Sequence, residues 1–415
     1  MIRLLMLMGL CAFVANNAGA AFTAGIAVRK VTPDPLLPVS GGTGPSHAVT
    51  QNKEDLTVRA LVLNDGTTRV AIVSVDFLGF PSVHGDKVRA KVPRIPADHI
   101  LIGATHTHSA PDMYCFPDEN GNTSGNPKYI DFVIDQTAAA INEAIDSEQP
   151  ASVKINTGEA RGKIAYNAYA EELYDPRCNV MQFLDTNGKP FATLVNYAIH
   201  PEVLGNKQGI LSPDLIGPLY DEIAAKGGGT GIFMNSAQGG MVTADNRDED
   251  GNDHRTWPEC LRIGHLLADQ AMRIIADAPV QQNPSLYCVS KRVDFPIDTP
   301  LIKHILTNSI IHYPLNPDGS VTVTINLVNF GNAQILTIPG EALPDIGYYL
   351  KRKMNGKFNC LFGLTNDAFG YILTKEDFDS FKMYDYISET SLGERTGPIL
   401  EKACLDLVKN NPAPK

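Results

Sequence analysis

Hydrophobic residues follow two different patterns of spacing along this chain, one typical of strands and one typical of helices. Short apolar runs, rich in β-branched residues and often followed by turn residues, are typical of buried strands; they are Ala60–Leu63, Val70–Val75, Ile100–Ala104, Phe191–Tyr197, Gly231–Met234, Val321–Val328 and Ala333–Ile338. Longer runs with apolar residues three and four positions apart predict amphipathic helices; they are Tyr129–Ile145, Leu215–Ala225 and Leu261–Ala278. This alternation predicts an α/β fold, and the strand-rich stretch from Ser285 to Ile338 adds antiparallel strands, so we expect a mixed β-sheet core with flanking helices.

The N-terminal segment has a pattern of its own. Arg3 precedes the apolar run Leu4–Ala15, and small residues ending in Ala18-Gly19-Ala20 follow. This pattern predicts a secretory signal peptide over residues 1–20, and its apolar run is too short to span a bilayer. No repeat or Pro-rich linker divides the remainder, so we expect one catalytic domain over residues 21–415. The protein would be exported, periplasmic or secreted, with no transmembrane anchor after signal removal.

Charge and cysteine usage narrow the classes of function. The formal net charge is −11 without a long basic run, which argues against nucleic acid as a partner. Seven cysteines include Cys11, and the other six show no C-x-x-C spacing, so a thiolate metal site is not favoured. The acidic segment Asp245–Asp253 predicts a solvated loop, because Trp257 stands where a calcium loop has its bidentate glutamate.

The most informative motif is the ATHTHS segment, in which an apolar strand runs into His106 and His108. In an extended segment these two side chains project to the same face, at a strand end where α/β proteins bind ligands. Neutral imidazole is a good zinc ligand. By itself the pair is equally consistent with two histidines in a polar turn.

Three further segments repeat the arrangement of a polar residue after an apolar run. His200 follows the strand Phe191–Tyr197, Glu341 follows a Pro-Gly turn, and Tyr371 follows a turn that contains Gly370. Each has an ordinary alternative: a structural histidine, an exposed loop glutamate and a core tyrosine.

Together these motifs resemble the neutral/alkaline non-lysosomal ceramidases and their bacterial ceramidase-like relatives. The motifs occur in the family's order over most of the chain after residue 20; they are GIA at Gly25, VTP at Val31, ALVL at Ala60, VSVD at Val73, ATHTHS at Ala104, NYAIHP at Asn196, PGE at Pro339 and GYI at Gly370.

The resemblance implies a single zinc ion and a set of residues around it. The implied ligands are His106, His200, Glu341 and the phenol oxygen of Tyr371. It also implies that His108 and Tyr384 line the reaction centre without binding metal, with Tyr386 as the alternative to Tyr384.

Other positions match residues that support the centre or bind substrate in the family. These are Asp76, Asp214, Gly239, Gly240 and Thr243. An Asp at a strand end can orient a ligand histidine, although capping the following helix is an equal alternative for Asp214.

The chain also departs from the family's pattern. Thr243 and Met241 stand at its serine and acidic positions in the G-D-V-S segment, and Ala168 follows Asn167 where the family has arginine. Arg161 and Arg177 are candidates to replace that arginine spatially. The second, β-sandwich domain of longer ceramidases has no counterpart before residue 415.

These observations predict zinc-dependent hydrolysis of an amide bond in an N-acyl lipid or a related amphiphile. The altered positions leave two alternatives open. One is a zinc hydrolase of an ester, lactone or carbohydrate derivative, and the other is a catalytically silent binding protein that uses the same pocket.

Overall fold

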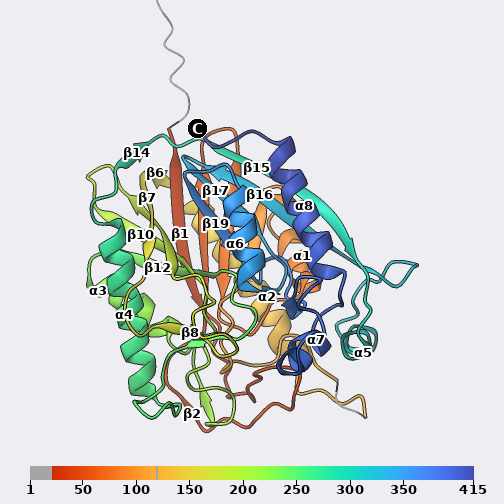
Figure 1. Cartoon of the computed structure of the whole chain (residues 1–415). Helices are drawn as coiled ribbons and strands as arrows, with labels where there is room; N and C mark the ends of the chain where they lie inside the picture. The colour runs from red at the N-terminus through yellow and green to blue at the C-terminus, as the bar shows by residue number, and fades with distance from the viewer. Residues whose placement is uncertain (1–20, 118–119) are drawn as a thin grey trace, which may run out of the picture.

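A computed structural model describes residues 21–117 and 120–415, so the predicted signal peptide lies outside the described residues. The strands form three main sheets (Figure 1). In spatial order, the first contains β5 (Ile100–Ala104), β4 (Arg69–Val75), β3 (Thr57–Asn64), β1 (Thr23–Lys30) and β6 (Gln149–Pro150). The second contains β12 (Thr230–Asn235), β10 (Pro190–Tyr197), β9 (Arg177–Leu184), β7 (Ser152–Glu159) and β14 (Val280–Gln282). The third contains β15 (Leu286–Phe295), β16 (Val321–Phe330), β17 (Ala333–Thr337) and β19 (Phe358–Phe362).

Short strand pairs and helices complete the fold. The pairs are β2 (Gln51–Asn52) with β11 (Ile210–Leu211), β8 (Ala165–Asn167) with β13 (Val242–Ala244), and β18 (Glu341–Ala342) with β20 (Tyr371–Ile372). The helices are α1 (Ser82–Ala90), α2 (Pro127–Asp146), α3 (Ile216–Ala225), α4 (Trp257–Ile275), α5 (Pro300–Asn308), α6 (Pro344–Lys353), α7 (Asp385–Glu389) and α8 (Thr396–Asn410), with 3₁₀ turns η1 (Ala97–His99) and η2 (Lys382–Tyr384).

Strand periodicity divides the apolar residues between one central core and three outer cores. Leu61 and Leu63 of β3 face the central core, whereas Val62 between them faces the outer core of the first sheet. Phe183 of the second sheet and Phe330 of the third stack in the same central core, with ring centroids 5.9 Å apart. Because both faces of these strands are buried, their sequences are nearly continuous apolar runs.

Helices cover the outer faces of the sheets. Helix α2 packs on β1 and β3, α3 and α4 pack on the second sheet, and α6 and α8 pack on the third. Asn126 caps α2, since its side chain accepts a hydrogen bond from the Tyr129 amide. Each helix therefore buries one apolar stripe against a sheet and leaves the opposite face in water.

Each sheet contains one parallel pair: β4 with β5, β10 with β12, and β17 with β19. The segments that leave these pairs at their carboxyl ends lie together. Ala104 donates its amide to Leu364 O (3.1 Å), and Gly363 donates to Asn235 O (3.0 Å), so all three sheets are linked there.

The predicted α/β fold with a mixed sheet and flanking helices is confirmed. Every strand and helix expected from the sequence is present, although the strands divide among three sheets. Among the elements of the three sheets and the helices, the sequence patterns did not predict β1, β6, β7, β9, β14, β19, α1, α5, α6, α7 or α8. In the described part of the chain, no helix combines the length and apolarity needed to cross a bilayer. The six cysteines described there are all free thiols, and five of them are buried.

Candidate active site

His106 lies just beyond β5 in a left-handed backbone conformation, with φ of 76°. Its amide donates to Phe77 O (2.9 Å) and its Nδ1 donates to Leu78 O (2.6 Å). A non-glycine residue in this conformation is uncommon and often marks a functional site. The segment is therefore not extended as expected, yet the turn still brings His106 and His108 together, with ring centroids 4.9 Å apart.

His200 follows β10 and is fixed by the strand beside it. Its amide and its Nδ1 both donate to the carbonyl oxygen of Val242, each at 2.8 Å. Since a carbonyl can only accept, Nδ1 carries a proton, and Nε2 presents a lone pair whenever the ring is neutral. The same holds for His106, so both histidines aim Nε2 at one point.

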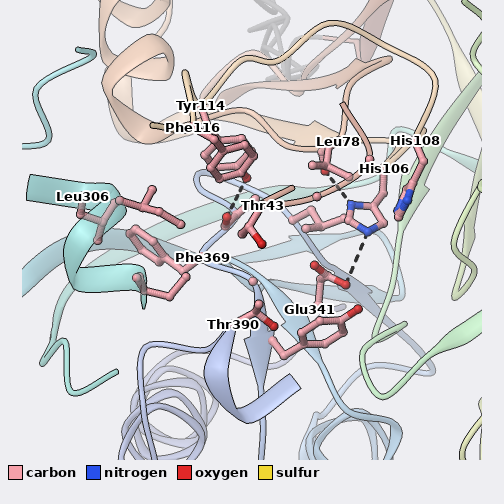
Figure 2. Close-up of a pocket in the computed structure, with 18 of the residues that line it drawn as sticks. Thr43, Leu78, His106, His108, Tyr114, Phe116, Leu306, Glu341, Phe369 and Thr390 are labelled. Atoms are coloured by element: carbon pink, nitrogen blue, oxygen red, sulfur yellow. Dashed lines mark hydrogen bonds and ion pairs between the residues drawn. The ribbon is translucent and has the colours of Figure 1, made fainter. Parts of the chain in front are cut away.

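Glu341, the first residue of β18, completes this convergence. Its Oε2 lies 2.9 Å from His200 Nε2 and 3.4 Å from His106 Nε2 (Figure 2 shows the latter). Burial would raise the pKa of Glu341, but the imidazoles of His106 and His200 outweigh burial and hold it well below its usual value.

Gly239 allows the neighbouring loop to reach Glu341. A Cβ at Gly239 would lie 2.1 Å from the Glu341 carbonyl oxygen, and the Gly239 amide donates to Ala342 O (2.9 Å). Only glycine permits this close approach.

These three side chains fit a metal ion. Two imidazole lone pairs that face a carboxylate repel it unless a cation lies between them or a histidine is protonated. Ligands about 2.0–2.1 Å from a tetrahedral zinc ion are about 3.3–3.4 Å apart. The His106–Glu341 separation matches this value, and the His200–Glu341 separation is slightly shorter.

His108 offers a second possible ligand set. Imidazole nitrogens of His106, His108 and His200 lie within 4.8 Å of one another. However, His108 Nδ1 faces Glu202 Oε2 at 3.6 Å, and its buried Nε2 has no hydrogen-bond partner among the described residues. Burial lowers the pKa of His108 to about 3, so its ring is neutral at ordinary pH.

Glu202 was not expected from the sequence. Its Oε1 accepts a hydrogen bond from the Thr243 hydroxyl (2.7 Å), while Oε2 faces His108. Burial raises its pKa, but His108, His200 and the Thr243 hydroxyl together lower it. Glu202 therefore holds a carboxylate near Nδ1 of His108. Its position two residues after a strand-end histidine was the only sequence signal.

Asn235, at the end of β12, connects the segments of both histidines. Its Nδ2 donates to Thr105 O (3.1 Å) and Ile199 O (2.7 Å), and its Oδ1 accepts from the Ile199 amide (3.2 Å). Thr105 and Ile199 directly precede His106 and His200. This fully buried amide thus fixes the separation of the two histidines.

The tyrosines occupy different positions around the centre. Tyr371 pairs with Glu341 between β20 and β18, and its hydroxyl contacts Met241 Sδ at 3.3 Å. Burial, with the charge of Glu341 adding to it, raises the Tyr371 pKa well above its usual value. Tyr384 instead packs against Tyr169, with ring centroids 5.4 Å apart, and does not line the pocket. Tyr386 lines it and stands edge-on to Tyr371 at 5.9 Å.

The two aspartates support the backbone rather than a ligand histidine, contrary to one expectation. Asp76 Oδ2 accepts from the amide and hydroxyl of Thr57 (2.8 and 2.7 Å), and burial raises its pKa to about 6. Asp214 accepts from the amides of Leu204 and Leu215 (2.9 and 2.8 Å), which joins the loop after His200 to the start of α3. Both candidate ligand histidines use backbone carbonyls as partners, so they need no carboxylate for orientation.

The segment 239–243 lies beside the candidate ligands. Gly240 and Met241 have φ of 69° and 67°, and Thr243 bridges to His200. Ala168 donates its amide to Met241 O (2.9 Å), so these two of the three departures from the family's pattern are neighbours.

Neither predicted replacement for the family's arginine reaches the centre. Arg177 pairs with Asp175 at 2.7 Å in a separate surface hollow, and Arg161 is exposed. Arg255 instead borders the site, next to Glu202.

His106, Glu341 and Tyr371 stand at one end of a pocket of about 670 Å³, and His200 lines the neighbouring one. Figure 2 shows Tyr114, Phe116, Leu306 and Phe369 on the opposite side from His106 and Glu341. A pocket with an apolar wall and a few convergent polar groups is typical of a small-molecule site.

Comparison with known proteins identifies similar sequences. The chain is 31% identical to neutral ceramidase B of Dictyostelium discoideum over 131 residues, 28% of this chain and 18% of that protein. It is 24% identical to the neutral ceramidase of Pseudomonas aeruginosa over 176 residues, 38% of this chain and 26% of that protein. The matched segments thus span about a quarter or less of each relative's length. No protein-family model matches the chain.

The fold is similar over a much larger part of the chain. The crystal structure of neutral ceramidase from Pseudomonas aeruginosa matches with a TM-score of 0.77 at 17% identity, covering 95% of this chain and 76% of that one. A ceramidase complexed with C2 matches with a TM-score of 0.78 over the same shares. Together with the sequence matches, this confirms the resemblance predicted from the motifs.

We expect Asn235→Ala to weaken zinc binding about 10- to 100-fold, the usual effect of removing a group that orients metal ligands. Titration calorimetry of metal-free protein measures this change. Asn329→Ala is the matched control, because Asn329 is also buried but donates to Pro412 O, at the far end of β16. Both variants should lose stability, and only Asn235→Ala should lose zinc affinity. Equal zinc affinities for the two would contradict the role of Asn235.

We expect His106→Ala and His200→Ala to lose zinc, measured as metal per chain by mass spectrometry. His108→Ala should retain zinc, because its ring faces Glu202 and only two histidines converge on Glu341. Circular dichroism checks that all three variants fold. Loss of zinc from His108→Ala to the same extent would instead establish a three-histidine site.

Proposed function

Because the chain is neutral ceramidase-like in sequence and shares the fold of these enzymes, we propose that it is a zinc-dependent amidohydrolase. Its substrate is an N-acyl lipid or a related amphiphile. The observation that carries this proposal is the convergence of His106, His200 and Glu341 at the end of a pocket with an apolar wall. We further propose that the protein is exported, which rests on the pattern of residues 1–20.

His106, His200 and Glu341 would hold the zinc ion, with Tyr371 at the edge of the same centre. Zinc bound to such a ligand set activates water and polarises a carbonyl group. The side chains around it then supply proton transfer and charge stabilisation.

His108 is placed to move the proton. With Nδ1–H directed at Glu202, the unpartnered Nε2 accepts a proton from the attacking water and later returns it to the departing amine. The negative charge of Glu202, 3.6 Å from Nδ1, favours a proton on that nitrogen, and the Thr243 hydroxyl holds the Glu202 carboxylate in place.

Tyr386 is placed to donate a hydrogen bond to the oxygen of the substrate carbonyl. Burial raises its pKa to about 12, so its phenol keeps the proton throughout the neutral range. The side chain lines the pocket together with His108. In this role Tyr386 replaces Tyr384, which the sequence favoured.

The residues that differ from the family's pattern affect which substrate the site favours. Met241 places a thioether beside the centre, so the Tyr371 hydroxyl meets sulfur instead of an oxygen, and Ala168 contacts Met241 only through its backbone amide. Hydroxyl groups of ceramide left unpaired there would each cost about 1–3 kcal/mol. We therefore propose that ceramide is a poor substrate compared with other N-acyl amphiphiles.

The proposal is tested by assaying chelator-treated and zinc-restored protein on N-acyl amides of matched chain length, a long-chain ceramide, esters and lactones. Zinc should restore hydrolysis of at least one N-acyl amide, with ceramide hydrolysed more slowly. Turnover of esters or lactones without any amide would contradict the amidohydrolase assignment. Ceramide as the best substrate would overturn the specificity argument alone.

Tyr386→Phe and Tyr384→Phe form a matched pair for the hydrogen-bond donor. Removing one preorganised donor typically costs about 10²- to 10³-fold in kcat, so Tyr386→Phe should lose about that much. Tyr384→Phe should stay within a factor of about two, because its ring packs on Tyr169 outside the pocket. Steady-state kinetics with an N-acyl amide that the zinc-restored protein hydrolyses measures kcat for both variants. A larger loss for Tyr384→Phe than for Tyr386→Phe would assign the hydrogen-bond donor to Tyr384 instead.

A further inference from the structure

The candidate site opens into two pockets of opposite chemistry. The first is the pocket described above, here called the apolar arm, whose far wall includes Phe116, Ile305, Leu306 and Phe369. The second, here called the polar arm, is a hollow open to solvent of about 1010 Å³ and is lined by Glu202, Asn206, Lys207, Gln208 and Arg255. Gly41, His108, Tyr371 and Tyr386 line both, so the catalytic groups stand where the arms meet.

The basic residues of the polar arm differ in how well their charge is matched. Arg255 pairs with Asp253 Oδ2 at 2.9 Å and also donates to Glu202 O at 3.4 Å. The Glu202 carboxylate is engaged by Thr243 and His108. Lys207 is exposed, and its ammonium group makes no hydrogen bond or ion pair with any residue that the structure describes. Lys207 therefore supplies an unmatched positive charge inside the arm.

The two arms dictate how an amide can lie across the catalytic groups. Alkyl groups gain about 0.8 kcal/mol for each CH₂ buried in the apolar arm, whereas a charged group there would be strongly disfavoured. The acyl chain consequently occupies the apolar arm. The amine half of the amide must then extend from the scissile carbonyl into the polar arm.

We propose that the amine half of the substrate carries an anionic group, a carboxylate or a phosphate, which Lys207 binds. The substrate class is thus an N-acyl amino acid or an N-acyl amine with a phosphorylated head group. This inference rests on the proposed amidohydrolase function. Water adds its oxygen to the acyl carbon, the C–N bond breaks, and the amine nitrogen takes the proton, which leaves a fatty acid and the anionic amine.

The test compares kcat/KM of zinc-loaded protein for three amides with the same dodecanoyl chain: N-dodecanoyl glycine, N-dodecanoyl phosphoethanolamine and uncharged N-dodecanoyl ethanolamine. We expect at least one anionic amide to be preferred by about two- to fivefold, the effect of one partly exposed ion pair. The ratio should fall as salt is added, because exposed charges are screened.

Lys207→Gln should reduce this preference to about one. Lys189→Gln is the matched control, since Lys189 is also exposed but lies in the turn between β9 and β10, and it should leave the ratio unchanged. Comparing the two anionic amides shows whether the polar arm favours a carboxylate or a phosphate. A preference for either one over the uncharged amide supports the inference.

Equal or better hydrolysis of the uncharged amide, or a preference that survives Lys207→Gln, would overturn this inference and leave the amidohydrolase function standing. If none of the three amides nor a long-chain ceramide is hydrolysed, the proposed function itself fails.

Discussion

Where the three sheets meet, the buried backbone groups at their strand ends need hydrogen-bond partners. The buried side-chain amides of Asn196 and Asn235 provide several of these partners. Asn196 Nδ2 donates to Met234 O, Asn235 O and Leu361 O, at 2.8–3.0 Å, which joins the second sheet to the third. Asn235 joins the second sheet to the loop after β5 through Thr105 O. An unpaired buried carbonyl would cost about 1–3 kcal/mol. These amides therefore stabilise the junction and fix the residues that precede both ligand histidines.

The local electrostatics depend on this fixed geometry. Two neutral imidazoles with their protons held on Nδ1 present lone pairs to Glu341, an arrangement that a cation or protonation of one histidine stabilises and that a flexible loop would relax. The left-handed conformation of His106 and the close approach of Gly239 are further constraints of the same kind. A protein that needs a preorganised metal centre can retain such backbone strain, because the packed core around the strained residues prevents them from relaxing.

Much of the fold could be predicted from the sequence because most strands are buried on both faces and their apolar runs are unambiguous. The strands β7 and β9 were missed, since residues such as Lys154 and Gln182 interrupt their apolar pattern. Histidines and a glutamate at strand ends identified the candidate centre, yet the backbone turn at His106 was not predictable from alternation. Glu202 and Asn235 were missed for another reason: both act through contacts with residues far away in the sequence. The same holds for Tyr386, which only its packing against Tyr371 distinguishes from Tyr384.

We propose that His106, His200 and Glu341 hold a zinc ion with room for a further ligand. X-ray absorption spectroscopy of zinc-loaded protein tests it most directly, because scattering from imidazole rings can be counted separately from oxygen ligands. The account predicts two imidazoles with the remaining ligands oxygen, and a change in the oxygen shell when a hydroxamate inhibitor with a dodecyl chain is added. Three imidazoles with no change on inhibitor binding, or a spectrum of zinc surrounded by water alone, would contradict it.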